Sequence, residues 1–119
     1  MRVDIPDSIY AFCVDLFGED VVSRDQLHNP DAIEISVNLS KLSGSPVLRV
    51  ELNFYRTDPP LAFMHLDNFD FEYKNQEELA LDEMRRYLKA LYEGRLKLRR
   101  KKLFGIEFGR KLVLIDPRN

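Results

Sequence analysis

The chain lacks the residues on which several classes of functional site depend. Its 119 residues include one cysteine, two histidines, five glycines and no tryptophan. A single cysteine excludes an internal disulfide framework and fits a reducing compartment. The two histidines form no His-Glu-x-x-His motif, and the five glycines form no Gly-rich phosphate-binding loop. We therefore expect neither a metal ion nor a cofactor.

Long hydrophobic runs are also missing. The longest apolar runs are short, such as residues 112–115, whereas about 20 apolar residues are needed to span a bilayer. The first residues contain no apolar signal region, so we expect a cytoplasmic protein without membrane contact. A hydrophobic content of 45% with 32% charged residues is typical of a soluble globular protein. This length predicts a single domain over residues 1–119.

Hydrophobic periodicity indicates two helices separated by strands. A helical pattern follows Pro6 and ends at Gly18, and residues 19–31 are polar enough to predict a loop. From Ile33 onward the period changes to two, with strands expected over residues 33–39, 48–55, 61–66 and 69–74. The second helix is expected to begin with an Asn75/Glu78 capping box and to end at Gly94, with Leu79 among the apolar residues of its buried face.

Two further strands are expected after Gly94, on either side of Gly105 and Gly109. The predicted order is α-β-β-β-(β)-α-β-β. Only two segments are long enough for helical crossovers, which favours a mainly antiparallel sheet. We therefore predict an α+β fold with about five or six strands and two helices packed on the sheet.

Charge is distributed very unevenly along the chain. Residues 1–94 hold nine basic and eighteen acidic side chains, whereas residues 95–119 hold nine basic and two acidic ones. The net charge of −2 is therefore the sum of −9 on residues 1–94 and +7 on residues 95–119. Such asymmetry indicates an electrostatic partner, or two ends of one fold that neutralise each other.

The basic segment offers one candidate surface. Alternation with leucines predicts a strand that presents its charges as a row, which a hairpin would enlarge. Such a row can bind nucleic-acid phosphates; it can also simply keep an exposed sheet edge soluble, or be neutralised by the acidic second helix. The candidate residues are Arg95, Lys97, Arg99, Lys101, Lys102, Arg110 and Lys111.

An acidic stretch from His65 to Lys74 offers another. Asp70, Glu72 and Lys74 share one face of a predicted strand, and carboxylates near a lysine are typical of metal-dependent hydrolases and nucleases. The same pattern is also expected for the solvated face of a strand whose aromatic residues pack inward.

A third candidate is an open sheet face. If Leu48, Val50, Leu52 and Phe54 point to the core, the residues between them point to the other side of the sheet. That side is either open to solvent or covered by a second helix, and the sequence favours neither arrangement. Tyrosines beside charged residues are typical of protein interfaces. The candidate partner-binding residues are Glu51, Tyr55, Asp67, Asp70 and Glu72.

The absence of any catalytic motif favours a binding protein over an enzyme. We expect a small protein of the inhibitor or immunity-protein type, which masks another macromolecule through its charged sheet face. The alternatives are a nucleic-acid-binding protein that uses residues 95–111 and a metal-dependent hydrolase that uses Asp70, Glu72 and Lys74. A protein partner is favoured, nucleic acid is the second choice, and a homodimer is compatible with each of them.

Overall fold

The structure is a computed structural model that describes residues 5–26, 31–103 and 106–115. A five-stranded antiparallel sheet forms its centre, with the strands in sequence order. These strands are β1 (Val22–Gln26), β2 (Ala32–Asn38), β3 (Arg49–Tyr55), β4 (Leu61–Leu66) and β5 (Phe69–Lys74). Two helices, α1 (Ile5–Phe17) and α2 (Glu77–Glu93), pack on this sheet. The predicted α+β class and the order of elements are therefore confirmed.

The first strand is the main departure from the sequence-based expectation. Residues 19–31 were expected to form a loop, but residues Glu19–Val21 form a 3₁₀ turn and β1 follows it. This strand pairs with β2 along its whole length, from Val22 opposite Val37 to Gln26 opposite Ile33. Because β1 lies at the edge of the sheet and buries Val22, its other residues remain polar and the alternation that marks a strand is weak.

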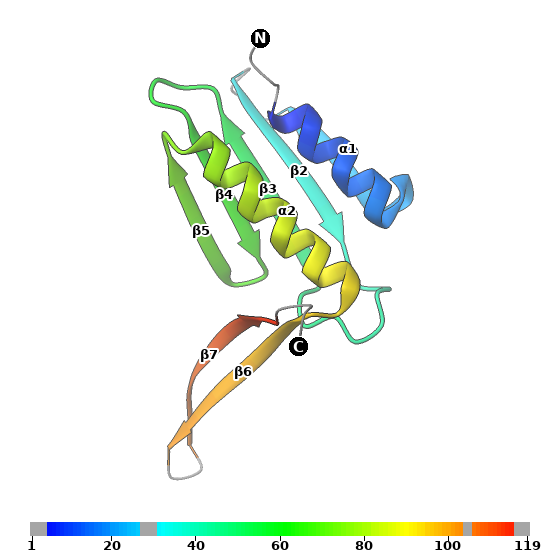
Figure 1. Cartoon of the computed structure of the whole chain (residues 1–119), viewed down its shortest axis with the longest axis vertical. Helices are drawn as coiled ribbons and strands as arrows, with labels where there is room; N and C mark the ends of the chain where they lie inside the picture. The colour runs from blue at the N-terminus through cyan, green and yellow to red at the C-terminus, as the bar shows by residue number, and fades with distance from the viewer. Residues whose placement is uncertain (1–4, 27–30, 104–105, 116–119) are drawn as a thin grey trace.

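Both helices cover the same face of the sheet (Figure 1). Helix α1 contacts β1 and β2, α2 contacts β4 and β5, and the two helices contact each other. The side chains between helices and sheet form one core, in which the largest fully buried residues include Ile9, Leu52, Met64, Met84 and Leu88. No helix of the described residues covers the opposite face of the sheet.

Helix α2 ends as predicted but begins differently. Gly94 has a φ of 72° and closes the helix through hydrogen bonds from its backbone N–H to the last turn, a conformation that suits glycine. Asn75 does not cap the N-terminus: its φ is 53°, and Gln76 occupies the cap position without a side-chain hydrogen bond. Leu79, expected on the buried face, is 43% exposed because the buried stripe runs instead through Ala80, Met84, Leu88 and Leu91.

The last two strands form a separate antiparallel pair. Strand β6 (Leu96–Leu103) and β7 (Ile106–Leu114) pair only with each other, and we call this pair the β6–β7 ribbon. It extends away from the rest of the molecule, beyond the end of α2 (Figure 1). No helix in the described part of the chain is both long and apolar enough to cross a membrane.

Candidate functional site

The helix-free face of the five-stranded sheet is the first candidate site, and we call it the open face. Strand register aligns its residues in rows that cross the sheet. One row joins Ser36, Glu51, His65 and Asp70, each directly opposite the next. The neighbouring row joins Glu34, Asn53, Phe63 and Glu72 in the same way. Directly opposite residues in antiparallel strands point to the same side, so these rows form one continuous surface.

Acidic side chains dominate the open face. Arg49 compensates two of them, because its guanidinium lies 3.1 Å from Glu51 and 3.9 Å from Glu34. Asp70 and Glu72 lie on β5, at the other edge of the sheet, and both are exposed. Asp25 on β1, directly opposite Glu34, is another exposed acid on this side, and Lys74 shares its side of β5 with Asp70 and Glu72. Exposed acidic side chains therefore lie at both edges of this face.

Three ring side chains run along the middle of the same face. Phe63 makes an edge-to-face contact with Tyr55, with ring centroids 5.7 Å apart, and stacks on the imidazole of His65 at 6.1 Å. His65 in turn places Nδ1 2.6 Å from the carboxylate of Asp70. The rings therefore form a half-buried string that is fixed by contacts at both ends and bordered by carboxylates.

One buried polar atom on this face has no partner. Among the described side chains, Asn53 Oδ1 is the one buried nitrogen or oxygen atom without a hydrogen bond. Asn53 lies at the centre of the sheet, between Glu34 on β2 and Phe63 on β4. A buried acceptor without a donor lowers the free energy of unfolding by about 1–3 kcal/mol, so Asn53 destabilises the free protein.

Asp67 has a different role from the other predicted partner-binding residues. Its carboxylate accepts hydrogen bonds from the backbone N–H groups of Leu48 and Arg49, at 3.0 Å each for the shorter contacts. Its φ of 53° places it in the tight turn between β4 and β5. Asp67 thus fixes the start of β3 against that turn, a long-range function that no local pattern in the sequence indicates. It also borders a hollow of about 380 Å³ with Glu51 and His65.

The metal-centre hypothesis receives no geometric support. Asp70, Glu72 and Lys74 share one side of β5, as expected, and Asp70 contacts His65. However, within the described ranges no group of three or more histidine, cysteine or acidic side chains is arranged to hold a metal ion.

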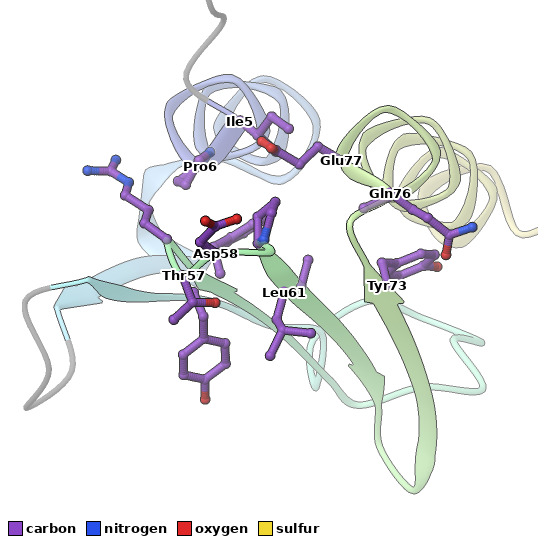
Figure 2. A pocket seen from close by; sticks show the side chains of 14 residues that line it. Ile5, Pro6, Thr57, Asp58, Leu61, Tyr73, Gln76 and Glu77 are labelled. Carbon is purple, nitrogen blue, oxygen red and sulfur yellow. The ribbon is translucent and has the colours of Figure 1, made fainter.

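A further cavity lies at the end of the sheet where both helices begin. It has a volume of about 460 Å³ and is mainly apolar, with walls that include Pro6, Leu61 and Ala80. Figure 2 shows Asp58 and Glu77 on either side of it, from the β3–β4 connection and from the first turn of α2. Neither histidine nor cysteine is among the described residues that line it.

The β6–β7 ribbon is the second candidate site. Lys97, Arg99 and Lys111 are exposed, and Arg99 lies directly opposite Lys111. Arg95, by contrast, is held at the base of the ribbon by Glu93, at 2.6 Å, and by the carbonyl oxygen of Ile115, at 2.9 Å. The remaining predicted residues of the basic surface lie in the two strands, but their side chains fall outside the described ones: Lys101, Lys102 and Arg110.

Comparison with known proteins supplies no name for either surface. No protein-family model matches the chain, and neither curated proteins nor solved structures give a significant match.

Proposed function

We propose that this is a non-catalytic binding protein that covers a basic surface of another protein with its open face, as an inhibitor or immunity protein does. The observation that carries the proposal is the pair of rows across the sheet, in which carboxylates border a string of rings on a face without a helix.

The open face is large enough to form the centre of an interface. Five strands spaced about 4.8 Å apart, with about six residues each at 3.3 Å per residue, give a surface of roughly 20 by 20 Å. Specific complexes bury about 800 Å² on each partner, so the sheet would supply the centre and the adjoining loops the rim. Exposed Leu48, at 59%, lies next to this face on such a loop.

Charge determines which partner fits. Asp70 and Glu72 supply exposed carboxylates at one edge and Asp25 supplies one at the other, while Arg49 already neutralises part of the charge on β2 and β3. A basic partner surface gains from this arrangement chiefly in association rate and specificity. An acidic partner would be repelled by the carboxylates at both edges.

The ring string supplies the anchors. Aromatic side chains near the centre of an interface provide most of the binding free energy in protein complexes. Tyr55 and Phe63 are half-buried and rigidly packed against each other, so little side-chain entropy is lost when a partner covers them. Asn53 adds an acceptor that lacks a donor in the free protein, and a basic or amide side chain of the partner can provide one after a rotation of the asparagine.

The test compares two charge-reversed proteins as baits in low-salt lysate. Asp70→Lys with Glu72→Lys reverses the open face, and Asp15→Lys with Asp82→Lys makes the same change in net charge on exposed residues of the helices. We expect one basic protein to be retained by the wild-type and helix-variant baits and to be lost by the open-face variant. Loss with both variants, or with neither, contradicts the proposal.

A second variant separates anchoring from charge. Phe63→Ala removes the central ring and should weaken the retained partner by more than about tenfold, the usual effect of an anchor residue. Isothermal titration with the purified partner measures this change. Thermal unfolding of each variant shows whether lost binding reflects lost folding.

A further inference from the structure

The β6–β7 ribbon is a protruding element with two chemically different sides. The longest dimension of the molecule is 51 Å, against 30 and 29 Å for the others, because the ribbon extends beyond the sheet and helices (Figure 1). Register places Leu96 opposite Leu114 and Leu98 opposite Leu112, which makes one side of the ribbon apolar near its base. Leu96 is 1% exposed and joins the main core.

The other side of the ribbon is basic. Lys97, Arg99 and Lys111 are all exposed on this side, with Val113 opposite Lys97. None of the three basic side chains forms an ion pair with any described residue, including the acidic residues of α2. Among the described residues, helix α2 therefore neutralises Arg95 at the base of the ribbon, through Glu93, but not these three side chains.

Like charges oppose each other across the two strands. Arg99 is directly opposite Lys111 on the basic side. Like charges in such positions destabilise a strand pair, and among the described strands none pairs with the ribbon to compensate them. The arrangement becomes favourable when an anion with closely spaced charges lies along the ribbon.

The base of the ribbon is fixed to α2, which determines where the basic side points. Arg95 N–H donates to Ala90 O at 2.8 Å, and Ile115 N–H donates to Arg95 O at 2.8 Å. The Arg95 side chain adds its contacts to Glu93 and to Ile115 O. Both strands are therefore tied to the end of the helix through one residue.

We propose that the β6–β7 ribbon binds the phosphate backbone of a nucleic-acid duplex, with its basic side along the groove. The major groove of B-DNA, about 12 Å wide, admits a two-stranded β-ribbon. Contacts to phosphates need only positioned cations, whereas protein interfaces depend on aromatic anchors. The exposed side chains described on the basic side, Lys97, Arg99 and Lys111, are closely spaced cations, an arrangement that suits a row of phosphates. This site is distinct from the open face and does not depend on the function proposed for it.

The experiment measures binding of a labelled duplex of about 20 base pairs by fluorescence anisotropy, between about 50 and 200 mM salt. The test variant is Arg99→Gln with Lys111→Gln. It should weaken binding at least tenfold at the lowest salt. It should also reduce the magnitude of the slope of log affinity against log salt concentration by about 2, because each of the two lost phosphate contacts contributes about 0.9. The matched control, Arg86→Gln with Lys89→Gln, removes the same charge from exposed positions of α2 and should bind like the wild type.

Several results would overturn the proposal. One is that the protein does not bind the duplex at the lowest salt, and another is that the α2 control weakens binding as much as the test variant. The others are that single strands bind more tightly than the duplex, or that polyglutamate of the same charge competes as effectively as the duplex. Asp70→Lys with Glu72→Lys should not weaken duplex binding, whereas it should abolish capture by the open face. The two proposals can therefore fail separately.

Discussion

The hydroxyl group of Tyr73 donates a 2.6 Å hydrogen bond to Oε2 of Glu83 and so joins the last strand of the sheet to the middle of α2. Tyr73 is 4% exposed. Burial raises its pKa, and the hydrogen bond and negative charge of Glu83 raise it further. Tyr73→Phe leaves this carboxylate without its donor, so we expect a loss of about 1–3 kcal/mol in the free energy of unfolding at neutral pH.

The cost of Tyr73→Phe should shrink in alkali. Above pH 10, the ordinary pKa of tyrosine, the unfolded chain loses the phenolic proton of Tyr73 while the folded protein keeps it, so the wild type loses more stability than the variant. Urea unfolding at neutral pH and near pH 11 measures the difference. Tyr92→Phe, at an exposed tyrosine, serves as the control and should show no such change. A cost that grows with pH would contradict the assignment.

Cys13 provides an independent alkaline effect. Burial raises the pKa of its thiol from 9.0 to about 12, so the folded protein keeps a proton that the unfolded chain loses above pH 9. Each pH unit in that interval lowers stability by about 1.4 kcal/mol. Between neutral pH and about pH 10.5, the wild type should therefore lose about 2 kcal/mol more than Cys13→Ala. Equal losses in the two proteins would show that the thiol ionises in the folded state.

Asn53 should be replaceable with a gain in stability. Valine removes the buried acceptor that lacks a donor and favours a strand, so Asn53→Val should stabilise the free protein by about 1 kcal/mol. The same change should weaken binding of the open-face partner if that partner supplies the missing donor. Thermal unfolding and titration of one purified variant test both effects, and a destabilised variant would show that the amide is satisfied in solution.

Asp67 should behave as a structural residue. Asp67→Ala removes the acceptor of two backbone N–H groups and places alanine at a positive φ, so we expect a loss of about 2 kcal/mol. Asp67→Asn keeps an acceptor and tolerates the same backbone conformation, so its loss should be smaller. Urea unfolding measures both variants. Unchanged stability in Asp67→Ala would return this residue to the set of candidate partner contacts.

The α+β fold could be predicted because its central elements have strong local patterns. Strands β2 and β3 alternate between buried and half-buried residues, and α2 ends at a glycine with a positive φ. Strand β1 could not be found in this way, because one of its sides faces solvent and Arg24 on the other side pairs with Asp7 of α1. That pairing depends on residues far apart in the sequence.

The candidate surfaces were predicted in part. Alternation placed Glu51, Tyr55, Asp70 and Glu72 on one side of the sheet, and the structure brings them onto a single face. The contributions of Phe63 and His65 were missed, because only the register between β3, β4 and β5 places these rings between the carboxylates. Register depends on turn geometry and burial across strands, which a single segment does not encode.

The separation of the acidic open face from the basic ribbon gives this molecule a large electric dipole moment despite its net charge of −2. An external field, such as that near a highly charged polymer or a chromatographic resin, will therefore orient the protein before it attracts or repels it. Cation and anion exchangers should each retain it at low ionic strength near its isoelectric point, by opposite ends. In a crowded solution the same dipole favours head-to-tail encounters between copies, at a rate that falls as salt is added.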